Sequence, residues 1–399
     1  MIKIGIVAGF VLLASTISFA QIDRAANKAP EMFRGGPEHL GQYQGKGFPA
    51  SNRLLWKFHT GGGIASSPAI QGGLLYVGSS DGYLYCVNRQ SGRLKWKFKA
   101  SAGITSSPAL ESGLVFFQAN DNRFYALYAR NGKLKWSFAG GRDVPFDGRC
   151  GECPSTEEGG WDFWTSSPVI VNNTVFFGSG DSNIYAINAS SGKVIWTYKT
   201  AGRVRSSPAV HQETVYAGSM DGKMYAVDSR DGHLRWSFKT EGNKDFPIGE
   251  IQSSPAVSSG LVIFGSRDYF LYALDSKTGR VVWKTLHADS WILSSAAIAN
   301  DGVYVGSSDG RFMQKVELKT GKEIWRTKLS LNVYSSPGIA GDYVYAGTAR
   351  GEMLALDEKT GKIRAGFLID NNIHSSPVIA NGVVYFGAEN GNLYAVGSK

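Results

Sequence analysis

The chain has 399 residues, of which 43% are hydrophobic, 12% aromatic and 19% charged, a composition that excludes a disordered or fibrous protein and provides a large apolar core. Its 50 glycines follow no Gly-X-Y period and therefore indicate many tight turns between short strands. The formal net charge is +9, but no basic run or recognition-helix pattern accompanies it, so we do not expect a nucleic acid as partner.

Residues 1–20 have the pattern of a secretory signal peptide. Lys3 gives a positive start, an apolar stretch follows, and Ala20 ends a small-residue cleavage site. We expect cleavage before Gln21, which leaves an N-terminal extension over residues 21–53. The apolar stretch is shorter than the ~20 residues that span a bilayer, so no transmembrane segment is expected. The mature protein is therefore predicted to be soluble and either periplasmic or secreted.

A repeat of about forty residues organises the rest of the chain, residues 54–399. Its marker is the string Ser-Ser-Pro or, once, Ser-Ser-Ala, and successive copies are 40, 60, 40, 47, 41, 41 and 40 residues apart. Insertions over residues 142–164 and 243–251 account for the two longer intervals. The eight copies begin at Ser66, Ser106, Ser166, Ser206, Ser253, Ser294, Ser335 and Ser375.

Each unit contains four short apolar segments separated by turn residues, as in residues 206–238. Pairs such as Asp221-Gly222 and Asp231-Gly232 favour tight hairpins, so each unit is predicted to be an antiparallel four-stranded meander. Such sheets bury both faces when they pack radially around an axis. We therefore predict an all-β fold, an eight-bladed β-propeller. The eighth unit lacks a fourth strand, and residues 54–58 are expected to supply it and close the ring.

A tryptophan recurs at one position of the fourth strand in seven of the eight units, and Ala365 takes its place in the remaining one. An indole between adjacent sheets buries a large area and can donate a hydrogen bond through its ring nitrogen. We interpret this set as structural: Trp56, Trp96, Trp136, Trp196, Trp236, Trp283 and Trp325.

These residues resemble the tryptophan-docking repeat of the pyrroloquinoline-quinone (PQQ) propellers. In one unit Ala226, Asp228, Gly232 and Trp236 carry the pattern, and residues 273–283 repeat it at the same spacing. The resemblance implies an eight-bladed propeller. The family contains quinoprotein dehydrogenases, which bind PQQ with calcium, and non-catalytic scaffold proteins such as the outer-membrane protein assembly factor BamB.

The dehydrogenase members carry an adjacent cysteine pair against the quinone, whereas this chain has no adjacent cysteines and no Cys-x-x-Cys-His haem motif. Cys150 and Cys153 lie in the longer insertion, where a disulfide that staples the loop is the favoured interpretation over redox chemistry. The six histidines have no metal-binding spacing, so no metal site is predicted. Cys86 replaces a small residue of a strand and is expected to be a buried free thiol.

The residue before each Ser-Ser pair varies from unit to unit and should face the mouth of the central funnel. A variable polar position at a shared funnel is where a ligand would be recognised, and an arginine there could hold an anion. The longer insertion is acidic and aromatic and suits a partner-binding loop or a calcium-stabilised lid. The candidate binding residues are Arg205, Gln252, Tyr334, His374, Trp161 and Trp164.

The sequence therefore favours a non-catalytic extracytoplasmic binding or scaffold propeller that resembles BamB, with a protein partner or a small ligand at its funnel face. No catalytic residue and no cofactor are predicted under this hypothesis. The alternative is a minimal PQQ-dependent quinoprotein oxidoreductase, which would hold PQQ and calcium over the funnel.

Overall fold

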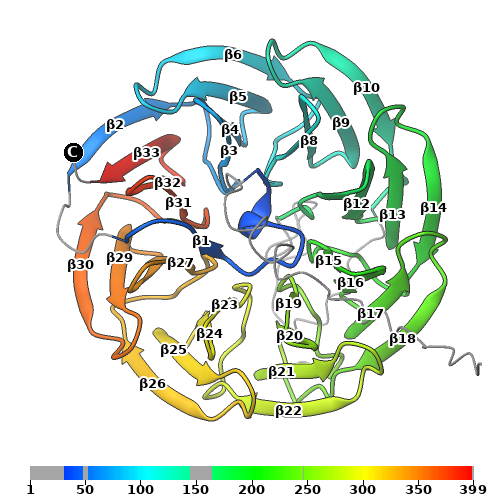
Figure 1. Ribbon diagram of the computed structural model, residues 1–399, viewed down its shortest axis with the longest axis vertical. Coiled ribbons are helices and arrows are strands. Elements are labelled where there is room, and N and C mark those ends of the chain that lie inside the picture. The colour runs from blue at the N-terminus through cyan, green and yellow to red at the C-terminus, as the bar shows by residue number, and fades with distance from the viewer. Residues whose placement is uncertain (1–30, 48–52, 144–163, 246, 398–399) are drawn as a thin grey trace, which may run out of the picture.

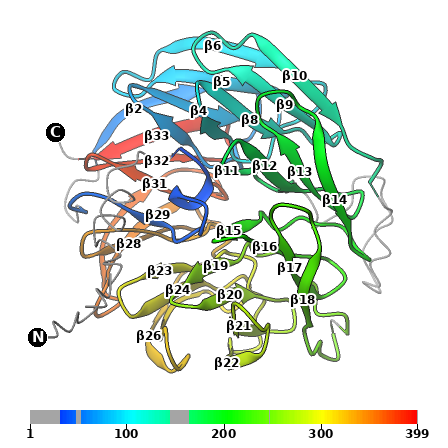
Figure 2. The ribbon, with the colours of Figure 1, turned by 45° about the vertical axis from the view of Figure 1, so that its right-hand side comes forward.

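The computed structural model describes residues 31–47, 53–143, 164–245 and 247–397. Eight antiparallel sheets stand radially around a central axis (Figure 1), and each is built from four strands that follow one another from the axis outward. The predicted eight-bladed β-propeller is thus confirmed. Seen obliquely, the blades form a thick ring, with an N-terminal segment running through its centre (Figure 2).

Each of the four strand positions recurs with nearly constant length in all eight blades. The innermost strands are β3 (Ala69–Gln71), β7 (Ala109–Glu111), β11 (Val169–Val171), β15 (Ala209–His211), β19 (Ala256–Ser258), β23 (Ala297–Ala299), β27 (Gly338–Ala340) and β31 (Val378–Ala380). The second strands are β4 (Leu74–Gly78), β8 (Leu114–Gln118), β12 (Thr174–Gly178), β16 (Thr214–Gly218), β20 (Leu261–Gly265), β24 (Gly302–Gly306), β28 (Tyr343–Gly347) and β32 (Val383–Gly387).

The third and fourth strands complete each blade toward the rim. The third strands are β5 (Tyr83–Asn88), β9 (Arg123–Tyr128), β13 (Asn183–Asn188), β17 (Lys223–Asp228), β21 (Phe270–Asp275), β25 (Phe312–Glu317), β29 (Glu352–Asp357) and β33 (Asn392–Gly397). The fourth strands are β6 (Leu94–Lys99), β10 (Leu134–Ala139), β14 (Val194–Lys199), β18 (Leu234–Lys239), β22 (Val281–Leu286), β26 (Glu323–Lys328), β30 (Ile363–Leu368) and β2 (Leu54–His59).

The ring is closed by β2, which pairs antiparallel with β33 in the last blade. Leu54 is opposite Val396 and His59 is opposite Asn392, so a hydrogen-bonded ladder joins two segments from opposite ends of the propeller sequence. This is the closure that the Leu-Leu-Trp-Lys-Phe segment predicts, because that segment has the pattern of every other fourth strand.

The tryptophans dock each blade onto the next. All seven indole Nε1 groups donate to a backbone carbonyl just after the third strand of the following blade, at 2.9–3.0 Å. A glycine of that blade's next turn lies against the ring; a Cβ added to Gly279 would come within 2.6 Å of Trp236. The carbonyls belong to Arg89, Ala129, Ala189, Ser229, Ser276, Leu318 and Glu358.

The position without a tryptophan, Ala365 on β30, faces the blade closed by β2 and β33. In the other blades the docking turn is the hairpin that joins the third strand to the fourth. No such hairpin joins β33 to β2, because β2 precedes all the other blade strands in the chain. The tryptophan is therefore missing at the one interface that lacks its docking turn.

The described part of the N-terminal extension, residues 31–47, fills the centre of the ring (Figure 1). It contains a 3₁₀ turn, η3 (Phe33–Gly35), and a short strand, β1 (Gln42–Tyr43), that pairs parallel with β27. Its carbonyls accept hydrogen bonds at 2.8–2.9 Å from inner-strand N–H groups of five blades, those of Leu110, Val210, Val257, Ile298 and Ile339. The extension thus satisfies backbone groups that would otherwise line an open channel.

Two buried basic side chains anchor this segment. The Arg34 guanidinium donates to the Pro337 and Ala296 carbonyls at 2.5 and 2.7 Å, and burial lowers the pKa of Arg34 to about 10. His39 is fully buried, and burial followed by the nearby Arg34 charge lowers its pKa to about 3. Both side chains pack inside the ring, so the extension is part of the core.

Blade six departs from the repeat through a buried ion pair. Lys315 stands where the other blades have alanine or cysteine, and its Nζ lies 2.6 Å from Oε1 of Glu358 in blade seven. Tyr304 donates a hydrogen bond to the same oxygen. Gly302 makes room for the lysine, since a Cβ there would come within 2.6 Å of its side chain. Burial works to raise the pKa of Glu358, but the hydrogen bonds from Lys315 and Tyr304 leave it below its usual value.

Candidate functional site

A cavity of about 90 Å³ opens on the axis, where the loops from the fourth strands enter the inner strands. All eight of the variable residues that precede the Ser-Ser pairs line it: Ala65, Thr105, Thr165, Arg205, Gln252, Leu293, Tyr334 and His374. Phe33 of the extension also lines the cavity, so the channel ends there as a blind funnel. The structure thus brings together the funnel position of every blade, including four of the candidate binding residues.

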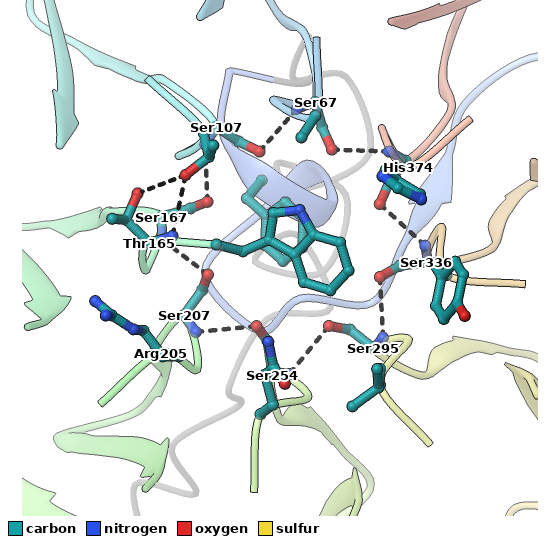
Figure 3. A pocket seen from close by; sticks show the side chains of 18 residues that line it. Ser67, Ser107, Thr165, Ser167, Arg205, Ser207, Ser254, Ser295, Ser336 and His374 are labelled. Atoms are coloured by element: carbon teal, nitrogen blue, oxygen red, sulfur yellow. Dashed lines mark hydrogen bonds between the residues drawn. The ribbon is translucent and has the colours of Figure 1, made fainter. Parts of the chain in front are cut away.

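The second serine of each Ser-Ser pair belongs to a closed ring around this cavity (Figure 3). Each backbone N–H donates to the Oγ of the equivalent serine in the next blade, at 2.9–3.1 Å, and the last donates back to the first. All eight serines are buried. The ring consists of Ser67, Ser107, Ser167, Ser207, Ser254, Ser295, Ser336 and Ser376.

In four of the eight blades the first serine of the pair makes two hydrogen bonds within its own blade. In blade five, Ser253 Oγ donates to the Gly265 carbonyl and accepts from the Gly265 N–H, both at 2.9 Å. The same pair of bonds recurs between Ser335 and Gly347 in blade seven. These bonds fix the start of the inner strand to the end of the second strand, and so hold the second serine at the cavity wall.

Trp164 lies in the funnel because the interface between blades two and three differs from the other seven. Elsewhere an isoleucine or valine packs against a glycine of the preceding blade, as Ile104 does against Gly78, where a Cβ would come within 2.3 Å. Here Gln118 replaces the glycine and Trp164 replaces the aliphatic residue. Because Gln118 has a side chain, the aliphatic pocket is not available to the indole.

The indole instead reaches across the funnel from blade three. Its ring centroid lies 6.5 Å from that of Tyr334 in blade seven and 5.6 Å from that of His374 in blade eight. The Tyr334 and His374 rings are themselves 5.4 Å apart. Three of the candidate binding residues therefore form one aromatic cluster at the mouth of the cavity.

Arg205 is the cationic side chain of the cavity wall, and it is held by Asp143 at the start of the longer insertion. Its Nη2 donates to Asp143 Oδ2 at 2.7 Å, and Asn122 donates to Oδ1 at 2.5 Å. Burial works to raise the pKa of Asp143, but the Arg205 charge and these hydrogen bonds leave it below its usual value. A carboxylate is thus already bound to the arginine that the sequence singles out for anions.

The other polar candidates also have neighbours at the cavity edge. His374 Nδ1 lies 3.2 Å from Glu389 Oε1, and Asn332 donates to the Tyr334 hydroxyl at 2.8 Å. Gln252 Oε1 accepts from Arg267 at 3.0 Å, whereas its Nε2 is buried and has no partner among the described residues. The amide of Gln252 is therefore oriented, and its N–H₂ group remains unused.

Three candidate residues, Trp161, Cys150 and Cys153, lie outside the described residues, so the disulfide and the insertion's role in binding stay predictions. Cys86 is buried and free, and burial raises the pKa of its thiol to about 12, which makes it unreactive.

Sequence reasoning missed the serine ring, the Asp143 carboxylate on Arg205, and the extension as the floor of the funnel. The pairing of Gln118 with Trp164 was readable from the sequence, because aligned repeats show one glycine and one aliphatic residue lost at the same interface. Asp143 carries no comparable signal, since it belongs to an insertion without a counterpart in the other units.

The described residues that line the cavity do not fit PQQ with calcium. No carboxylate is among the described residues that line it, and the described part of the chain contains no group of three His, Cys, Asp or Glu side chains that could hold a metal ion. Its volume is about 90 Å³, whereas sites for drug-sized ligands span about 300 to 1,000 Å³.

Fold and repeat define the class: the protein is a PQQ-repeat β-propeller. Residues 165–399, more than half of the chain, match the family model described as the β-propeller of beta-alanine-activating enzyme, and the chain belongs to that family. Residues 48–150 match the model described as outer membrane protein assembly factor BamB. No curated protein sequence matches the chain.

Solved structures with the same fold include BamB and dehydrogenases. BamB from Moraxella catarrhalis is 18% identical, with a TM-score of 0.69, covering 87% of this chain and 98% of its own. A europium-containing methanol dehydrogenase is 13% identical, with a TM-score of 0.77. The match covers 95% of this chain and 100% of the dehydrogenase chain. Quinohemoprotein alcohol dehydrogenase from Comamonas testosteroni is 13% identical, with a TM-score of 0.75. The match covers 95% of this chain and 82% of the dehydrogenase chain. At these identities the likeness establishes the fold.

Proposed function

We propose that this protein is a non-catalytic, extracytoplasmic binding propeller that takes a small ligand in its funnel and a protein partner on the same face. The observation that carries the proposal is the wall of the cavity: hydroxyl, amide and guanidinium groups that can donate hydrogen bonds, with no carboxylate among the described lining residues. Such a wall can bind and orient a ligand; its imidazole, His374, lies in hydrogen-bond contact with Glu389, and no serine hydroxyl among the described residues is hydrogen-bonded to it as to a general base.

The resemblance to BamB supports the partner-binding part of the proposal. The BamB family model covers residues 48–150, which include the start of the longer insertion. The described ends of that insertion, Asp143 and Trp164, lie at the funnel, so a partner that contacts these ends would lie beside the ligand site. Sites on loops that a rigid scaffold positions are common places for recognition.

Export is the first part of this proposal to test. Expression of the full chain in a bacterial host should give a mature protein that begins at Gln21 and is recovered from the periplasm or the medium. Intact-mass measurement and N-terminal sequencing of the recovered protein report the cut. Full-length protein retained in the cytoplasm would contradict the extracytoplasmic assignment. Among the described residues, no helix is long and apolar enough to cross a membrane.

The quinoprotein alternative predicts turnover, and the binding proposal predicts none. Mature protein is incubated with PQQ and calcium and assayed for dye-coupled oxidation of alcohols and sugars, with an Arg205→Gln variant as the matched control. We expect dye reduction no faster than in the buffer with PQQ alone. Turnover that depends on the protein and is lost in Arg205→Gln would replace the binding proposal with an unusually small dehydrogenase.

A further inference from the structure

The serine ring leaves eight hydroxyl protons at the cavity wall. Each Oγ accepts an N–H from the neighbouring blade, and no described residue accepts a hydrogen bond from any of the eight hydroxyls in return. A hydroxyl carries one proton and two acceptor lone pairs, so each of these serines still has a donor to offer. Because all eight line the cavity, these donors surround one small volume (Figure 3).

Two further donors belong to the same wall. Gln252 is 7% exposed, and its buried Nε2 has no hydrogen-bond partner among the described residues. Arg205, also 7% exposed, brings a permanent positive charge to the wall. A buried amide N–H without a partner costs free energy, which a guest that accepts its hydrogen bond would recover.

The wall is correspondingly poor in negative charge. Among its described residues there is no aspartate or glutamate. The two nearest carboxylates are already paired: Asp143 with Arg205, and Glu389 with His374. Neither carboxylate belongs to the residues that line the cavity. A site rich in donors, with one cation and no anion in its wall, is complementary to a guest that carries negative charge and several acceptor oxygens.

We propose that the funnel cavity binds one small oxyanion, of the size of phosphate, sulfate or a short carboxylate, on Gln252, Arg205 and the hydroxyls of the serine ring. The inference rests on the proposed binding function and names the chemistry of its small ligand. The cavity volume of about 90 Å³ is well below the ~300 Å³ at which sites for drug-sized ligands begin, which suits such an anion.

Asp143 acts as an internal competitor in this site. Its Oδ2 lies 2.7 Å from Arg205 Nη2, and an incoming oxyanion would make the same kind of contact with the guanidinium. An anion that contacts Arg205 shares or displaces this carboxylate, so its affinity reflects the difference between the two contacts. Neutralising Asp143 should therefore strengthen anion binding, whereas removing the guanidinium should weaken it. This opposite response distinguishes the funnel from an adventitious basic patch.

The test is calorimetric titration of the mature protein with inorganic phosphate, and separately with acetate, at low ionic strength. We expect one saturable site in the wild type. Arg205→Gln and Gln252→Leu should each weaken binding at least tenfold, and Asp143→Asn should strengthen it severalfold. Arg93→Gln, a change at an exposed arginine on a turn away from the funnel, is the matched control and should leave the affinity unchanged. Thermal unfolding of each variant verifies that it is folded.

Absence of saturable binding in the folded wild type would overturn the proposal, because the ligand of the funnel would then not be a small oxyanion. Binding that is equal in Arg205→Gln, Gln252→Leu and the wild type would also overturn it, because the anion would then lie elsewhere on the basic surface. Neither result touches the proposed function, which fails only if PQQ-dependent turnover or cytoplasmic retention is found.

Discussion

Replacing Trp236 by alanine is expected to lower the free energy of unfolding by about 3–5 kcal/mol, the range for a large buried aromatic side chain. Its indole is buried between blades four and five, donates to the Ser276 carbonyl at 3.0 Å, and lies 5.8 Å from the Tyr216 ring centroid. The substitution leaves a cavity and removes one of the two donors to the Ser276 carbonyl, the other being the Tyr216 hydroxyl. Urea-induced unfolding followed by circular dichroism measures the loss.

Two related variants separate docking from simple burial. Trp236→Phe keeps most of the apolar contact and loses only the hydrogen bond, so its cost should be smaller than that of alanine. Ala365→Trp, at the interface without a docking turn, should bring no gain in stability. A loss below about 1 kcal/mol for Trp236→Ala, or a clear stabilisation by Ala365→Trp, would show that the tryptophans do not stabilise the ring by docking onto the next blade.

The second large effect is expected at the buried ion pair of blade six. Lys315→Met removes the cation and leaves the Glu358 carboxylate buried with Tyr304 alone, which should cost about 3–5 kcal/mol. The double variant Lys315→Met/Glu358→Leu should recover most of this loss. Tyr304 can then donate to the backbone carbonyl of residue 358, as Tyr76 and Tyr216 do to the equivalent carbonyls of their neighbouring blades.

The same pair predicts a dependence of stability on pH. Because the pKa of Glu358 is lowered in the folded state, its contribution is present above the unfolded-state value of about 4.3 and is lost as the pH falls through the folded-state value. The stability difference between the wild type and the double variant should therefore be constant at neutral pH and should shift in favour of the double variant in acid. A difference that is independent of pH down to pH 3, or a double variant as unstable as Lys315→Met, would contradict this account of the pair.

The blades were predictable because their signals are periodic and local. Turn pairs such as Asp221-Gly222 fix the hairpins, and the recurring tryptophan marks every fourth strand except the one that Ala365 occupies. Closure by β2 followed from the same periodicity, since residues 54–58 repeat the fourth-strand pattern ahead of the first Ser-Ser pair.

The funnel was predictable in position and less so in chemistry. The residue before each Ser-Ser pair lines the cavity as expected, because the inner strand of every blade begins at the axis. The serine ring joins groups that are 40 or more residues apart in the sequence. Asp143 and Arg205, which form an ion pair, are separated by 62 residues. The extension over residues 31–47 carries no repeat, so its sequence does not indicate that Arg34 binds carbonyls of blades six and seven.

The central claim is that the funnel binds a small anion and does not hold a quinone. The most direct measurement is a pair of calorimetric titrations on one preparation of the mature protein, first with PQQ in the presence of calcium and then with phosphate. We predict no stoichiometric binding of PQQ and one saturable phosphate site whose affinity falls at least tenfold in Arg205→Gln. Tight stoichiometric PQQ binding that depends on calcium, with no phosphate site, would contradict the account.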